Sequence, residues 1–298
     1  MRPGRAPAIY SCPRNPRHPS THAHVHLSAA VQLLLVVIVA MISGVMNSVA
    51  GGGTLLTFPA LVGLGISPIV ANATSTVALW PASVSSMYGY RQELEGVLPW
   101  AGAFALPSLL GGAAGALLLL HTSPARFSAL VPWLVLGATA LFVVQEPVMR
   151  AIRLRQSAVA LTDNRPLAIE DSAVTRQLPS LPFLLYQFLV AIYGGYFGAG
   201  AGILMLAALG FMGLSNIHRM NGLKNWGGLC MNAIAALLFA SGRLVDWPVA
   251  LSMAVGAMVG GYTGSRVAQR VGQRAVRYAI VVIGLGSGLV MLGAELRR

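Results

Sequence analysis

Ten long apolar runs, separated by short polar or glycine-rich gaps, limit what this chain can fold into more than any other feature. A membrane-spanning helix needs about 20 apolar residues, and most of the runs approach that length. They do not alternate apolar and polar residues, as barrel strands would. Because backbone groups in lipid must find hydrogen bonds within their own segment, the sequence predicts an all-α polytopic membrane protein with about 8–10 hydrophobic segments. The runs cover residues 28–49, 54–66, 68–90, 97–120, 126–146, 181–199, 201–214, 217–241, 245–268 and 277–294.

Composition excludes a water-soluble globule and a mainly disordered chain. Charged residues make up 9% of the 298 positions and hydrophobic residues 56%. Soluble domains carry about 25% charged residues. The formal net charge is +12, and the arginines lie in the gaps between apolar runs. Such gaps anchor membrane helices at the lipid headgroups, so we expect the lipid bilayer as a partner and no nucleic acid.

Polar segments divide the chain into four parts. Residues 1–27 are polar, basic and rich in proline, which predicts a disordered basic tail rather than a signal peptide. Residues 28–146 form a first transmembrane repeat, and residues 181–298 form a second. Between them lies a polar linker, residues 147–180, whose five arginines indicate the cytoplasmic side. The expected location is the cell (inner) membrane, with multiple passes.

The two apolar parts show signs of an internal duplication. A shift of 149 positions superimposes glycines and one asparagine, and the order of the apolar runs also matches. If each glycine-broken pair of runs crosses the membrane once, the repeats are parallel; if it crosses twice, they are inverted. The sequence leaves both arrangements open. The superimposed pairs include Gly51 with Gly200, Gly53 with Gly202, and Asn72 with Asn221.

Glycine clusters break the first helix of each repeat. One cluster is Gly51, Gly52 and Gly53, and its counterpart contains Gly200 and Gly202. Glycine inside a helix costs about 1 kcal/mol relative to alanine, so a cluster favours unwinding. Unwound backbone at membrane depth is tolerated where it lines a cavity, and the new helix N-terminus offers N–H groups to an anion. Paired breaks indicate a transporter's central site, although close helix packing is the alternative.

Two further glycine patterns lack neighbouring polar residues. These patterns therefore favour close packing of helices over a binding role. Their residues are Gly111, Gly112 and Gly115 in the first part, and Gly260, Gly261 and Gly264 in the second.

Polar side chains follow each break inside an apolar run. Asn72, Thr74 and Ser75 open one run, and Asn221 and Lys224 open the corresponding one. An amide or an ammonium group in hydrocarbon needs a partner, so these residues are candidates for binding a solute. Two alternatives stay open: Lys224 reaches out to the membrane interface, and Asn72 and Asn221 cap helices that begin there.

Signals for catalysis, metals and cofactors are missing from the apolar regions. No paired carboxylates, no HExxH, no CxxC and no Walker motif occur, so we expect no enzyme activity, no metal and no cofactor. His22, His24 and His26 alternate in the polar tail, where a solvated cluster is favoured over a metal site. No Asp or Glu lies clearly inside a run, which leaves the driving ion open.

Ordered motifs across both parts resemble the sulfite exporter TauE/SafE family, also called the toluene sulfonate uptake permease family. This resemblance implies a polytopic inner-membrane permease of two homologous halves that moves sulfite, sulfonates or related organosulfur anions. The chain departs from a full second glycine triplet at Ala201. The motifs are AGGGTL at 50–55, FPAL at 58–61, ANATST at 71–76, GYR at 89–91, GAGAG at 198–202, HRMNGLKN at 218–225, VDW at 245–247 and GGY at 260–262.

We therefore expect a secondary transporter that holds a small anionic solute between the two repeats. The alternatives are a passive anion channel or facilitator of the same architecture, and a non-transporting subunit of a membrane assembly. A homo-oligomer is also left open. The expected substrate-binding residues are Gly51, Gly52, Gly53, Asn72, Thr74, Ser75, Gly200, Gly202, Asn221 and Lys224.

Overall fold

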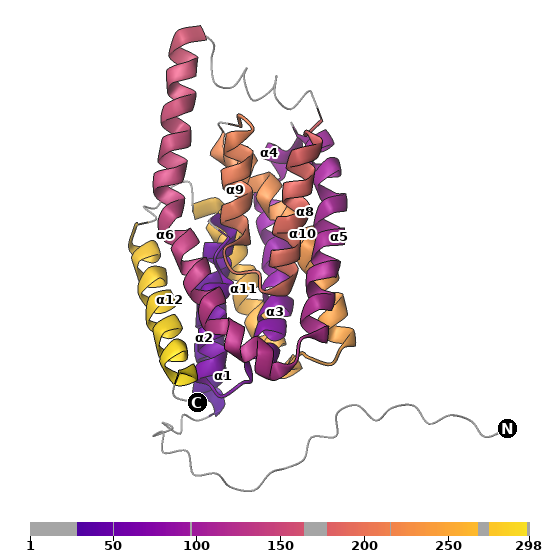
Figure 1. The fold of residues 1–298 in the computed structure, drawn as a ribbon, viewed down its shortest axis with the longest axis vertical. Helices are drawn as coiled ribbons and strands as arrows, with labels where there is room; N and C mark the ends of the chain where they lie inside the picture. The colour runs from indigo at the N-terminus through magenta and orange to yellow at the C-terminus, as the bar shows by residue number, and fades with distance from the viewer. Residues whose placement is uncertain are drawn as a thin grey trace, which may run out of the picture.

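The computed structural model is a bundle of α-helices with no strand among the residues it describes (Figure 1). It describes residues 29–49, 51–95, 97–163, 178–214, 216–267 and 274–296. The predicted basic tail, with its three histidines, lies outside these ranges. The predicted all-helical membrane fold is confirmed. In the first part the helices are α1 (Ala29–Val49), α2 (Thr54–Gly63), α3 (Pro68–Gly89), α4 (Arg91–Glu95), α5 (Leu98–His121) and α6 (Pro124–Asp163). In the second they are α8 (Leu181–Tyr196), α9 (Ala201–Phe211), α10 (Ile217–Ser241), α11 (Trp247–Val267) and α12 (Arg274–Glu295).

Apolar length supports the membrane assignment. In the described part of the chain, three helices are long and apolar enough to cross a membrane, and four shorter helices are also apolar. Leu106, Leu118 and Leu189 expose more than half of their surface on the outside of the bundle, where lipid would cover them. The three long segments are Ala30–Val49, Leu98–His121 and Pro124–Gln145; the shorter ones are Thr54–Gly63, Leu181–Tyr196, Ala201–Phe211 and Val281–Glu295.

Each broken helix packs beside a helix from the other half of the chain. α1 lies along α11 and runs in the same direction, since Gly44 meets Ala257 while Val45 lies against Gly264. α8 lies along α5 and also runs in the same direction. Gly111 lies against Phe188, and four residues further along both helices Gly115 lies against Ile192. The two halves are therefore interleaved rather than side by side.

Helix directions show that the two halves are inverted relative to each other. α3 runs parallel to α11, and α10 runs parallel to α5. The short α4 joins α3 to α5 at one end of the bundle, so these two helices run in opposite directions (Figure 1). Thus α1 and α3 run one way, and their counterparts α8 and α10 run the other way. Of the two arrangements left open above, the structure has the inverted one; common ancestry of the halves stays a prediction.

Closely packed glycines let the paired helices approach. A Cβ atom on Gly112 would lie 2.6 Å from the carbonyl oxygen of Met231, and one on Gly261 would lie 2.5 Å from that of Ala82. Real Cβ atoms do not come so close, so these positions admit only glycine without a shift of backbone. The packing role predicted for both glycine patterns is confirmed.

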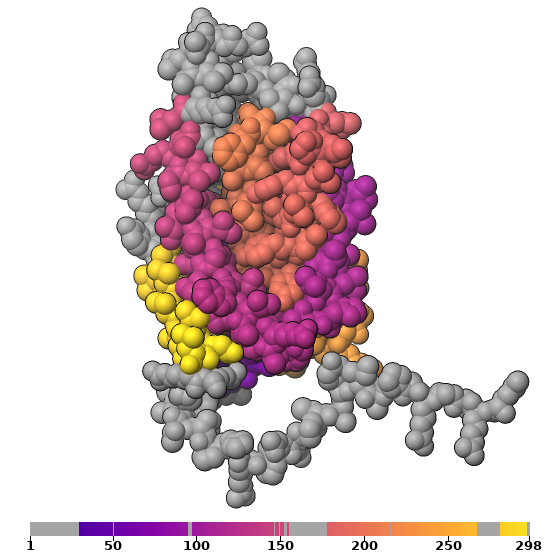
Figure 2. Space-filling view, viewed as in Figure 1, coloured from indigo at the N-terminus to yellow at the C-terminus, as the bar shows by residue number. Residues whose placement is uncertain are grey.

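α6 extends farther than the sequence predicts. It continues to Asp163, well into the segment 147–180 that was expected to act as a polar linker. The added turns contain three Ala, three Arg and two Leu residues, which are strong helix formers, so polarity alone does not end the helix. Figure 1 shows this end of α6 projecting beyond the bundle, and Figure 2 shows the yellow α12 beside the bundle-embedded part of α6.

We expect opposite effects from two Gly→Ala substitutions. Gly260→Ala places a Cβ against the carbonyl oxygen of Met41 and should destabilise the fold by about 1–3 kcal/mol. Gly286→Ala, where no atom lies within 4 Å, should be neutral or stabilise α12 by up to about 1 kcal/mol. Thermal unfolding of the purified variants in one detergent checks this. Equal losses at both positions would show that close packing is not what requires Gly260.

Candidate functional site

The two glycine breaks meet in the middle of the bundle. Gly51, with φ of +78°, ends the path of α1, and Gly200, with φ of +81°, precedes α9. Both values lie in the left-handed region that glycine adopts at little cost, so each helix stops there. A Cβ atom on Gly51 would lie 2.5 Å from Cα of Gly202, which shows how closely the breaks approach. The predicted helix breaks are therefore confirmed, and they lie in contact.

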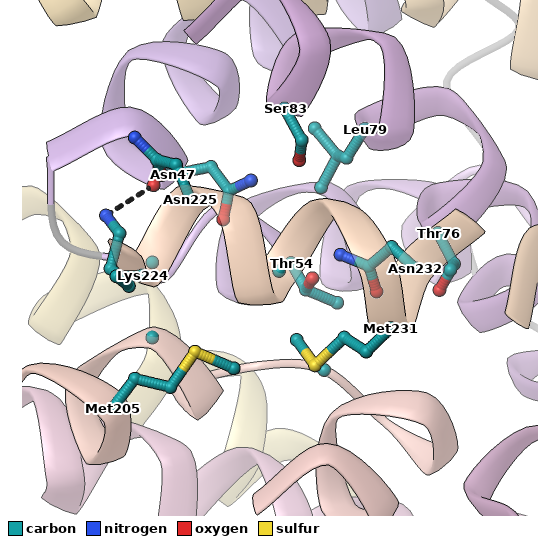
Figure 3. A pocket seen from close by; sticks show the side chains of 14 residues that line it. Asn47, Thr54, Thr76, Leu79, Ser83, Met205, Lys224, Asn225, Met231 and Asn232 are labelled. Atoms are coloured by element: carbon teal, nitrogen blue, oxygen red, sulfur yellow. Dashed lines mark hydrogen bonds between the residues drawn. The ribbon is translucent and has the colours of Figure 1, made fainter. Parts of the chain in front are cut away.

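The last carbonyl groups of α1 accept hydrogen bonds from α10. The ammonium Nζ of Lys224 donates to the carbonyl oxygens of Asn47, at 3.0 Å, and Ser48, at 2.9 Å. The amide Nδ2 of Asn225 also donates to the Ser48 carbonyl oxygen, at 3.3 Å. A cation at a helix C-terminus is favourable because the helix dipole is negative there. Figure 3 shows Lys224 beside Asn47 with this bond dashed.

The end of α8 is held by a matching bond from α3. The Nδ2 group of Asn72 donates to the carbonyl oxygen of Tyr196 at 2.9 Å. Under the 149-residue shift Tyr196 corresponds to Asn47, the residue that accepts from Lys224. Each broken helix is thus capped by a side chain from the opposite half.

A small cavity lies between the two breaks, α3 and α10. About 30 Å³ of it is open to the centre of a water molecule, which is room for two or three waters. Figure 3 shows amide, hydroxyl and thioether side chains from both halves pointing into this space. The lining residues are Asn47, Gly51, Thr54, Thr76, Leu79, Ser83, Gly198, Gly202, Met205, Lys224, Asn225, Gly228, Met231 and Asn232.

Three of the ten expected binding residues line this cavity: Gly51, Gly202 and Lys224. Two other glycines of the clusters face neighbouring helices. A Cβ on Gly52 would meet the Phe142 ring at 2.7 Å, and one on Gly53 would meet the Ser43 carbonyl oxygen at 2.6 Å. These two glycines permit packing around the break and do not line the cavity.

The remaining expected residues are not among those that line the cavity. Asn72 bonds to the end of α8, and the Oγ1 of Thr74 accepts a hydrogen bond of 3.0 Å from the backbone N–H of Asp246. Ser75 and Asn221 are buried, and Gly200 packs near Ala138 and Leu141. Their roles as ligands stay predictions.

Both alternatives considered for these residues are wrong. Lys224 is only 2% exposed and turns inward, so it does not reach out to the membrane interface. Asn72 and Asn221 lie inside α3 and α10, whose N-cap residues are Ser67 and Asn216. α3 begins at Pro68, four residues before Asn72, because proline is favoured in the first turn of a helix.

Sequence reasoning missed most of the polar lining. Asn225, Gly228 and Asn232 are spaced three and four residues apart, so they share one face of α10. That spacing was a usable signal, because two amides and a glycine on one helical face are unusual in an apolar run. Asn47 gave a weaker signal, since a single amide near a helix end often serves only as a cap.

Lys224 is the only lysine in the chain; the other 19 basic residues are all arginines. No ion pair to its ammonium group occurs among the residues that the structure describes. Its two acceptors are uncharged carbonyl groups, so no opposite charge from them offsets a protonated Lys224. A buried charge without an opposite charge is costly.

An all-helical membrane fold with two facing helix breaks around a polar cavity is the architecture of a membrane transporter. The chain belongs to the sulfite exporter TauE/SafE family, whose profile matches residues 36–291.

Curated relatives agree with this assignment. The probable membrane transporter protein YfcA of Escherichia coli K12 is 30% identical over 229 residues, which cover 73% of this chain and 74% of that protein. A probable membrane transporter protein of Haemophilus influenzae is 26% identical over 238 residues, covering 76% and 81%. No solved structure matches the chain.

A pair of glycine substitutions tests the contact between the breaks. Gly51→Ala should cost about 1–2 kcal/mol for the left-handed backbone and a further 1–3 kcal/mol or so for the collision with Gly202. Gly65→Ala should cost only the backbone share, because its φ is +88° and no atom lies within 4 Å. Thermal unfolding in detergent measures both. If the two variants lose the same stability, the breaks do not touch as described.

Proposed function

We propose that the protein is a secondary transporter in the cell (inner) membrane that carries a small anion, with sulfite, a sulfonate or a related organosulfur anion as its substrate class. The observation that carries this proposal is the buried ammonium of Lys224 at a cavity between two helix breaks. Membership in the sulfite exporter family supports the choice of an oxyanion.

The cavity offers what an oxyanion needs. Lys224 supplies positive charge, and the amide or hydroxyl groups of Thr54, Ser83 and Asn232 supply neutral hydrogen-bond donors. The N-terminus of α9 begins at Ala201, so the N–H of Gly202 lies in the first turn, where the helix dipole favours negative charge. In this conformation the volume suits a compact anion. A bulky aromatic sulfonate requires the halves to move apart.

The inverted arrangement supports alternating access. In inverted-repeat transporters the two halves exchange conformations around a fixed central site. Here the cavity lies between α3 and α10, which are counterparts in the two halves. Opening toward either side of the membrane would leave Lys224 with the bound anion at the centre. A small cavity between the two helix breaks favours a carrier over a continuous channel.

Removing the charge of Lys224 should abolish most transport. Lys224→Gln keeps hydrogen-bond donors for the ends of α1 but removes the positive charge. Because a charged hydrogen bond contributes about 1.5–3 kcal/mol, we expect anion affinity to fall about 10- to 100-fold. Counterflow of labelled sulfite into proteoliposomes measures this. Arg219→Gln, which removes a charge from the first turn of α10, should transport normally and serves as the matched control.

The outcome also separates a carrier from a channel. Saturable counterflow supports the carrier, whereas single-channel currents of the same anion would support the channel. Unchanged saturable flux in the Lys224→Gln variant would overturn the proposed site.

A bound anion should protect Lys224 from chemical modification. Because the chain has a single lysine, acetylation by acetic anhydride at that position can be read from one peptide by mass spectrometry. We expect methanesulfonate to slow the acetylation several-fold relative to chloride at the same ionic strength. The variant Arg219→Lys supplies a second, more exposed lysine on α10, whose modification should not change. Equal rates in both salts would place the anion elsewhere.

A further inference from the structure

The C-terminal end of α8 lacks the positive charge that the end of α1 has. At α1, Lys224 and Asn225 donate to the carbonyl oxygens of Asn47 and Ser48. Under the 149-residue shift the corresponding donors would be Ser75 and Thr76, and the corresponding acceptors Tyr196 and Phe197. A serine stands where the lysine would be.

Several buried oxygen atoms, at this end of α8 and on the part of α3 that bonds to it, lack a hydrogen-bond donor. The Oδ1 of Asn72 and the Oγ of Ser75 are buried, and neither has a hydrogen-bond partner within the described residues. Thr76 donates to the backbone of its own helix, at the Asn72 carbonyl oxygen, and so does not serve α8. Phe197 is 1% exposed, and no hydrogen bond to its carbonyl oxygen is found in the described part of the chain. Tyr196 receives one bond and keeps a second lone pair.

These atoms are all oxygens. Asn72 and Ser75 lie three residues apart, so they project from the same face of α3, and the Asn72 amide touches the Tyr196 carbonyl. Buried oxygens without donors are costly, and the single bond from Asn72 leaves several of these oxygens without one. Carbonyl and hydroxyl oxygens at the C-terminus of an interrupted helix are the ligands that bind Na⁺ in transporters.

We propose that a sodium ion binds at the end of α8, with the carbonyl oxygens of Tyr196 and Phe197, Asn72 Oδ1 and Ser75 Oγ as its ligands. The ion takes the place that the ammonium of Lys224 takes at the end of α1. A monovalent cation fits, because all four ligands are neutral and no acidic side chain is among them. At the end of α1 the cation is the side chain of Lys224, whereas at the end of α8 the cation is a sodium ion taken from solution.

This inference rests on the proposed function only for its consequence, which is that anion movement is coupled to sodium. Binding itself is tested without any anion substrate. The full chain is purified in detergent, and its thermal unfolding is followed in sodium chloride and in choline chloride at equal ionic strength. Sodium at ten times its half-saturating concentration should raise the midpoint by about 3 °C or more.

Ser75→Ala should abolish this sodium-specific rise while leaving the midpoint in choline chloride nearly unchanged, because the Ser75 hydroxyl bonds to no described group. Ser85→Ala is the matched control on α3. Its hydroxyl donates to Ala82 and Met258 carbonyl oxygens away from the end of α8, and its sodium response should persist.

A rise that choline chloride reproduces, or that Ser75→Ala retains, would overturn the sodium site. Neither result affects the anion cavity at Lys224. Conversely, a sodium-specific rise in a protein that moves no anion would leave the cation site standing and reject the proposed transport function.

Discussion

The ends of two interrupted helices, buried away from water, impose the constraint on which the rest of this structure depends. A helix that stops inside an apolar bundle leaves carbonyl groups that must find donors. Here the donors come from the opposite half: Lys224 serves Asn47 and Ser48, and Asn72 serves Tyr196. These bonds bring α3 and α10 to the centre, and the cavity lies between them.

Local chemistry made much of the fold predictable. The run 28–49 became α1, Ala29–Val49, because apolarity defines the helix and the glycines after it end the run. The relative orientation of the two halves was not predictable. Under either count of membrane crossings, some arginine-rich gaps fall on the outer side, so the distribution of arginines does not decide between the two orientations. The reach of α6 was also missed. Polar residues with high helix propensity do not reveal where a helix ends.

The sequence was enough to predict where the candidate site lies, but only some of the residues that line it. The glycines showed where the helices break, and Lys224 stood out as a charge in an apolar run. Which neighbouring side chains turn into the cavity depends on helix rotation and on contacts between residues far apart in sequence. That is why Asn47 and Asn232 were missed, and why Asn72 and Asn221 were expected in the lining but are not part of it.

The pairing of α1 with α11, and of α5 with α8, has a consequence for biosynthesis. α1 is synthesised well before α11, Trp247–Val267, the helix against which it packs. Until that segment is synthesised, the face of α1 that packs against the glycines of α11 has only lipid or a chaperone to cover it. The earlier half therefore cannot reach its final packing before α11 has been synthesised.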